Sequence, residues 1–378
     1  NMGSGRVTAG AGRGVLNGPG LPADRAAAFQ QITWDRSATF AFEMRDGAMS
    51  SALRRAEFNG ATPTSADSRG VIATDQRSAL SGDTLVADFI ATSASANVLS
   101  KVTVTGSALA EGGGAGSLAS DELAIEFTPD SSGREGEPTR MLASGNVVGQ
   151  REGTTLRTDS LASGLARDGK NNIGATIVNA DGNVRFDRTD GVGATARALV
   201  ADARAQTVTL TGDLASDPAS VYKDKSIITG EKIDLDGAAR TLLVTGAGNF
   251  SHEQIRRKGP RGDQPATEGL GDPDLVRADA TWSVGMRFND VTGVLECEGE
   301  VVAMTDPAGL RVDLVRGNRV RLELTPGGEA SGGKKSSLDG LDVASGDDRR
   351  LLRAEVFGHS YDTQGGAPAV VESSQYVP

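Results

Sequence analysis

Few residues of this chain are of a type that catalyses reactions or binds metal ions. Its two histidines, His252 and His359, lie at the ends of alternating segments, and neither has a Cys, Asp or Glu at the spacing of a known metal motif. We interpret both as exposed histidines at strand ends. The single cysteine, Cys297, falls at an apolar-face position, which indicates an inert buried thiol.

Other patterns with catalytic potential are incomplete. Gly164–Lys170 and Gly328–Lys334 resemble phosphate-binding loops, but the Ser or Thr that would hold Mg²⁺ is replaced by Asn171 and Lys335. No GxSxG elbow is present. Alternating glutamates at 296, 298 and 300 are the candidate carboxylate row of a polysaccharide-active enzyme, and their crowding is more typical of a solvated face. The sequence therefore predicts a protein without enzymatic activity, cofactor or metal.

The elements that position these residues belong to a repeat. A short alternating strand is followed by a Gly, then usually by Asn, Ser, Asp or Glu. The glycines of successive copies, 30 to 59 residues apart, are Gly60, Gly106, Gly145, Gly182, Gly212, Gly248, Gly299 and Gly358. A loose period of this size predicts a stacked repeat fold rather than a single globular core.

In each copy the apolar residues lie an even number of positions from the glycine, a relation we call its parity. Val102 and Val104 precede Gly106 at even separations, whereas Thr103 and Thr105 have the other parity. Side chains alternate across a strand, so each Gly lies on the apolar face, and we interpret it as lining the interior. Clean alternation predicts half-buried antiparallel strands in an all-β fold, with one short helix over Ala23–Gln31.

The chain has 378 residues, 50 of them Gly, and a formal net charge of −11. A negative net charge without a run of basic residues argues against binding to nucleic acid and against docking on an anionic membrane surface. We expect a tag remnant and flexible segment over 1–31, one elongated unit over 32–361, and a tail or edge strand over 362–378. Charged, Gly-rich loop insertions are expected at 255–273 and 326–350.

Two alternating motifs resemble the OstA-like repeat of the periplasmic lipopolysaccharide-transport proteins LptA, LptC and the N-terminal domain of LptD. An A-x-G-N-V strand is carried by Ala143–Val147 and Ala180–Val184. An L-x-A-D-x-L strand is carried by Leu118–Leu123 and Leu156–Leu161. The resemblance is best over 80–251 and implies a β-taco, or β-jellyroll, in which two antiparallel sheets enclose an apolar groove for lipid acyl chains.

The resemblance implies a non-enzymatic periplasmic bridge protein that holds lipopolysaccharide or a similar amphiphile for transport to the outer membrane. It also implies end-to-end strand pairing with itself or with other bridge proteins, and a signal or anchor that this chain does not carry. Two alternatives remain: a surface or adhesion module with a closed core and no lipid, and the polysaccharide-active enzyme. The lipid-groove candidates are Phe40, Phe42, Val102, Val104, Leu123, Ile125, Phe127, Val147, Val184, Phe186, Val208, Leu210, Leu242, Val244, Phe250, Val284, Met286, Phe288 and Leu322.

Overall fold

A computed structural model describes residues 6–15, 31–46, 48–60, 70–74, 78–93, 97–112, 116–133, 136–167, 173–223, 225–255, 275–307, 311–324, 351–358 and 370–375. These residues form strands and turns and contain no helix, so the predicted all-β antiparallel class is confirmed. Of the helix expected over Ala23–Gln31, residues 23–30 lie outside the described residues, and Gln31 begins a strand. The insertions at 256–273 and 326–350 also lie outside them.

The chain divides into two compact units, Asn1–Val184 and Arg185–Pro378, where the sequence predicted one. The strands of the first unit are β1 (Arg6–Ala9), β2 (Gly12–Val15), β3 (Gln31–Trp34), β4 (Ser37–Arg45), β5 (Ala48–Asn59), β6 (Val71–Thr74), β7 (Ala79–Gly82), β8 (Thr84–Ile90), β9 (Val98–Gly112), β10 (Gly116–Pro129), β11 (Gly136–Arg151) and β12 (Thr154–Arg167). The boundary falls within β13 (Ile173–Arg188).

The second unit contains both short and long strands. They are β14 (Val192–Asp202), β15 (Thr207–Thr211), β16 (Ala219–Lys223), β17 (Ser226–Asp236), β18 (Thr241–Ile255), β19 (Leu275–Trp282), β20 (Gly285–Asn289), β21 (Val294–Pro307), β22 (Arg311–Leu324), β23 (Leu351–Phe357) and β24 (Val370–Gln375).

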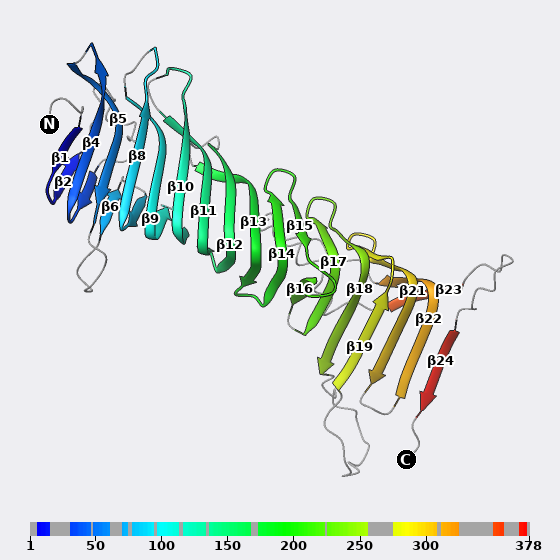
Figure 1. The fold of residues 1–378 in the computed structure, drawn as a ribbon. Coiled ribbons are helices and arrows are strands. Elements are labelled where there is room, and N and C mark those ends of the chain that lie inside the picture. Colours follow the sequence, from blue (N-terminus) through cyan, green and yellow to red (C-terminus); the bar gives the residue numbers. More distant parts are fainter. Residues whose placement is uncertain are drawn as a thin grey trace, which may run out of the picture. The chain divides into compact units, whose positions relative to one another are not determined.

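The first unit has two layers because its long strands each belong to both. One part of β9, Val98–Thr105, pairs with β8, and another part, Leu109–Glu111, pairs with β7. Strands β4, β5 and β8 continue the first layer, and β3, β6 and β7 continue the second. Strands β9 to β12 then run side by side, each antiparallel to the next (Figure 1). The two layers therefore meet along a series of corners within the long strands.

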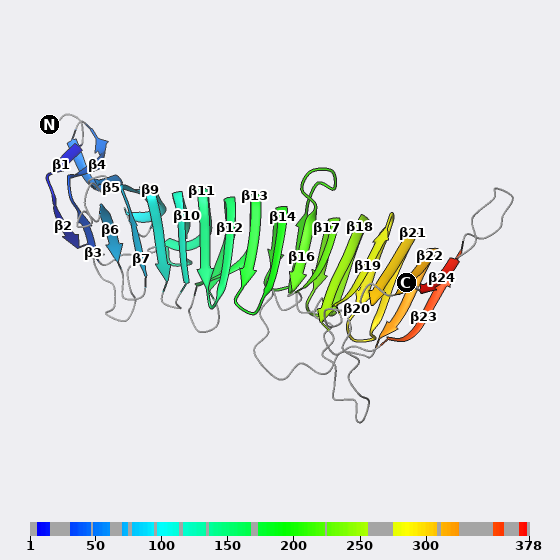
Figure 2. The same cartoon turned by 90° about the horizontal axis from the view of Figure 1, so that it is seen from below.

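The second unit repeats this arrangement. Strand β17 pairs with β15 through one half and with β16 through the other, and β18 pairs in the same way with β20 and β19. Between β15 and β16 the strand path is interrupted by a loop at 212–218, which projects beyond the neighbouring strand ends in Figure 2. The antiparallel partners of β22 are β21, β23 and β24, so the segment expected as a tail or edge strand contributes β24.

The N-terminal segment corrects one prediction. Residues 6–15, expected to be flexible, form β1 and β2, which pair with β4 and β3. The Gly-rich composition suggested disorder. Gly nevertheless has the same backbone N–H and C=O groups as other residues, so it can pair in a sheet. Trp34 fixes the segment by donating a hydrogen bond from Nε1 to the carbonyl oxygen of Gly10 at 2.7 Å.

Candidate functional site

Four of the recurring glycines mark corners at which a strand passes from one layer to the other. Gly106, Gly145, Gly182 and Gly299 have φ between 74° and 80°, and the residue after each also has positive φ. At the first three of them an added Cβ would meet an aspartate carboxylate: Asp83, in the bend between β7 and β8, and Asp121 and Asp159, on β10 and β12. These aspartates are spaced 38 residues apart.

An Asn completes the corners at Gly145 and Gly182. Asn146 donates a hydrogen bond from Nδ2 to Asp121 Oδ2 at 3.0 Å, and Asn183 donates one to Asp159 Oδ2 at 2.8 Å. Asn adopts the left-handed region more readily than most residues and also supplies the donor. The A-x-G-N-V and L-x-A-D-x-L motifs are thus two halves of one local structure.

These corners correct the interpretation that the glycines line the interior. Gly145 is required by its backbone conformation and by the adjacent carboxylate, not by room for a ligand. Gly60, Gly212 and Gly248 have no positive φ, but an added Cβ would collide with neighbouring backbone atoms. The predicted parity itself holds, because Val102, Val104 and Ala108, at even separations from Gly106, are buried.

The interior next to the corners is a closed core. In the first unit one cross-strand row joins side chains that are each at most 7% exposed: Ala38, Phe58, Leu85, Val104, Leu123, Ala143 and Leu161. Aromatic rings fill this core near β3 to β5, where Phe58 contacts Trp34 at 5.2 Å and Phe40 at 5.7 Å between ring centroids. No space for a ligand is expected beside such closely packed side chains.

The next inward row away from the corners is only partly closed. Its side chains Ala56, Ala87 and Val102 are at most 3% exposed, whereas Phe40, Ile125 and Met141 are half-buried. Five apolar side chains farther outward are half-buried, and all of them except Phe42 pack against the edge of the core: Phe42, Leu53, Phe89, Leu99 and Phe127. We call these five residues the outer apolar row.

The second unit has the same closed inner row. Side chains at most 4% exposed pair in the order Leu199, Leu210, Ile233, Val244, Met286, Cys297 and Val320. Burial raises the pKa of the Cys297 thiol to about 12, in keeping with the predicted inert thiol. Farther from the corners, Leu295 and Leu322 form a pair of half-buried side chains.

The groove candidates therefore fall into two sets and one exception. The buried candidates are Val102, Val104, Leu123, Val147, Val184, Phe186, Val208, Leu210, Leu242, Val244, Met286 and Phe288. The half-buried candidates are Phe40, Phe42, Ile125, Phe127, Phe250 and Leu322. Val284 is 58% exposed, opposite to its predicted inward position, because it lies in the corner between β19 and β20, where strand alternation is interrupted.

His252 was predicted to be an exposed strand-end residue, and the structure corrects this. It is half-buried on β18, with Nδ1 2.7 Å from Ser226 Oγ and its ring stacked on Phe250 at 6.4 Å. His359 lies outside the described residues. Because His252 is two residues after Phe250 on the same strand, the sequence could have placed it on the inward face. Its contact with Ser226, 26 residues away, depends on strand pairing and could not be read from the sequence.

The glutamate row at 296, 298 and 300 faces arginines. Arg319 donates to Glu296 Oε1 at 2.9 Å and lies 3.8 Å from Glu298, and Arg321 lies 3.7 Å from Glu296. These ion pairs lie on the outward face of β21 and β22, opposite in parity to the buried Cys297 and Val320. Such an arrangement is typical of a solvated sheet face, as the sequence predicted.

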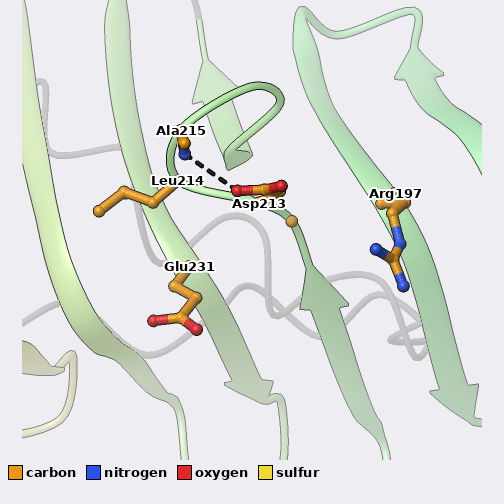
Figure 3. Close-up of a pocket in the computed structure, with 6 residues that line it drawn as sticks. Arg197, Asp213, Leu214, Ala215 and Glu231 are labelled. Carbon is orange, nitrogen blue, oxygen red and sulfur yellow. Dashed lines mark hydrogen bonds between the residues drawn. The ribbon is translucent and has the colours of Figure 1, made fainter.

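A surface hollow of about 440 Å³ lies at the interrupted corner, a place the sequence did not single out. Arg197 occupies the position 38 residues after Asp159, so a cation replaces the corner aspartate there. Figure 3 shows Arg197 and Glu231 on either side of the loop that carries Asp213 and Leu214. The loop is held by a hydrogen bond from the Ala215 amide to Asp213 Oδ1 at 3.0 Å.

The described part of the chain contains no group of three or more His, Cys, Asp or Glu residues arranged to hold a metal ion. It also contains no helix long and apolar enough to cross a membrane. No protein-family model matches the chain, and a search of curated proteins gives no match.

Proposed function

We propose that this chain is a non-enzymatic amphiphile-binding protein that holds acyl chains between its two β-layers. The proposal rests on the resemblance to the OstA-like repeat, whose members carry lipopolysaccharide across the periplasm. We propose the same compartment and ligand class here, with transport toward the outer membrane. End-to-end strand pairing with itself or with other bridge proteins is part of this proposal.

The observation that carries the proposal is the outer apolar row. Its large side chains face inward yet stay half-buried, although the row next to the corners is closed. Apolar surface left partly in water is stabilised by any apolar partner that covers it, at about 0.8 kcal/mol per methylene buried. An acyl chain lying along the outer apolar row would gain this energy without opening the inner core.

The closed inner rows also favour a second candidate, a structural or adhesion module without lipid. Alternating strands require a core whether or not they bind a ligand. Side chains such as Val104 and Leu210, at most 1% exposed, already have that core. The two candidates differ in whether the outer apolar row acquires a ligand.

Site-specific crosslinking separates them. A photoreactive amino acid at Phe127, in the outer apolar row, should capture lipopolysaccharide or another lipid in cells. The matched control is Glu126, the neighbouring residue on the opposite face, which pairs with Arg140 at 4.0 Å. Lipid adducts from Glu126 but not from Phe127 would contradict the inward assignment. The absence of adducts from both, together with no lipid extracted from the purified protein, would favour the structural module.

A further inference from the structure

Three polar side chains lie in one cross-strand row on the inward face of the second unit. Lys223 of β16 pairs with Ser226 of β17, and Ser226 pairs with His252 of β18. The adjacent row toward the corners is apolar and consists of Val221, Ile228 and Phe250. Residues two apart share a face, so the polar row continues the face of this apolar row.

The position of this polar row is the outer margin of the interior. Val221 and Ile228 are buried, whereas Lys223, Ser226 and His252 are half-buried. An apolar interior that ends in a row of hydrogen-bond donors matches an amphiphile, whose tail and head group need different surroundings.

His252 is held in one orientation. Its Nδ1 lies 2.7 Å from Ser226 Oγ, and its ring is nearly parallel to that of Phe250, at an interplanar angle of 6°. The structure describes no partner for Nε2 of this ring. Nε2 is therefore the ring atom available to a ligand, and the hydrogen bond and stacking reduce the entropy lost when it binds.

Lys223 is a cation without an ion-pair partner in the part of the chain that the structure describes, and so is Lys225 in the adjoining turn. Some other cations in this unit do pair with carboxylates, as Lys232 does with Asp234 of the same strand at 2.8 Å. On the other layer, the inward residue after Phe288 is Asp290, and its charge is compensated by an ion pair with Arg240. Among the described residues, Lys223 thus gives the polar row a positive charge that no ion pair neutralises, in a chain whose formal net charge is −11.

We propose that Lys223 and His252, whose ring Ser226 orients, bind the anionic head group, a phosphate or a similar oxyanion, of an amphiphile whose tail lies against Phe250. Lysine ammonium and imidazole N–H groups are donors that suit oxyanions, and the Ser226 hydroxyl donates to Nδ1 when Nε2 carries the proton. This inference rests on the proposed function, because it assigns the head group of the same ligand.

The test uses two amphiphiles with the same tail, monododecyl phosphate and the uncharged dodecyl maltoside, titrated into the full chain by calorimetry below their micelle concentrations. We expect the phosphate to bind about tenfold more tightly, the effect of one or two charge-assisted hydrogen bonds. Lys223→Gln and His252→Gln should each remove most of this difference and leave the affinity for dodecyl maltoside unchanged. Lys232→Gln, a lysine on the outward face, should leave both affinities unchanged.

The outcomes distinguish this inference from the proposed function. If both amphiphiles bind equally to the wild-type chain and to Lys223→Gln, the head-group site is refuted while amphiphile binding stands. If inorganic phosphate alone binds as tightly as monododecyl phosphate, the site belongs to a free anion and the assignment to an amphiphile is overturned. If the wild-type chain binds neither amphiphile, the proposed function and the head-group site both fail. Circular dichroism of each variant checks that its strands remain folded.

Discussion

Replacing Gly145 by alanine should destabilise the first unit by on the order of 2–4 kcal/mol. The φ of Gly145 is 74°, and a residue with a Cβ pays about 1–2 kcal/mol in the left-handed region. The added Cβ would also lie 2.7 Å from Asp121 Cγ and 2.8 Å from Asp121 Cβ. Asp121 must then move and lose its 3.0 Å hydrogen bond from Asn146, at a cost of about 0.5–1.5 kcal/mol.

Gly149 provides a matched control on the same strand. Its φ is not positive, and the one neighbour of an added Cβ is Leu118 Cδ1 at 3.7 Å, an ordinary van der Waals contact. Gly149→Ala should therefore change stability by no more than about 1 kcal/mol, and it stabilises the chain if the reduced entropy of the unfolded state dominates.

The assay is urea-induced unfolding followed by circular dichroism, combined with hydrogen exchange of the amides in β10 to β12. The double variant Asp121→Ala with Gly145→Ala lacks the displaced carboxylate, so it should cost less than the sum of the two single variants. Equal stability of Gly145→Ala and Gly149→Ala would refute the corner assignment. Additive costs in the double variant would show that the carboxylate is not what the new Cβ meets.

Three further predictions follow from individual contacts. Asn183→Ala loses the 2.8 Å hydrogen bond to Asp159 and places alanine at a φ of 50°, so urea unfolding should show a loss of about 1–2 kcal/mol. Cys297, with a folded pKa of about 12 and an unfolded pKa near 9.0, should resist iodoacetamide at pH 8 until the chain unfolds. Its contribution to stability is fully present below pH 9 and is lost as the pH rises from 9 through 12, so Cys297→Ala should make the stability fall less steeply over this range. Burial and, to a smaller extent, the 2.6 Å hydrogen bond to Asp187 raise the pKa of Tyr222. The midpoint of its ultraviolet titration should therefore lie above pH 10, and it should shift back toward pH 10 in Asp187→Asn.

Some expectations were wrong for reasons that local sequence does not contain. The glycines have the predicted parity, but their role at corners appears only when Asp121, from the preceding strand, is seen beneath Gly145. Val284 follows the alternating pattern of Trp282 and Met286, yet it is exposed because a corner separates β19 from β20. Pattern alone does not locate a corner that lacks the Gly-Asn signal.

The sequence by itself determined the all-β class and, away from the corners, the face on which the strand side chains lie. A strand has a period of two, so alternating Val, Leu and Thr residues specify the buried face without reference to any partner. The same reasoning identified the inert thiol of Cys297 and the solvated glutamates at 296 and 298.

The tertiary structure alone decided which inward side chains are closed off and which remain half-buried. Val104 and Phe127 have comparable sequence patterns, but Val104 lies next to a corner and Phe127 lies far from one. Depth in the two-layered fold depends on distance from the corner, and the approach of Ser226 to His252 depends on pairing between separate strands. Neither quantity is local, because both arise from contacts between segments that the chain must fold to bring together.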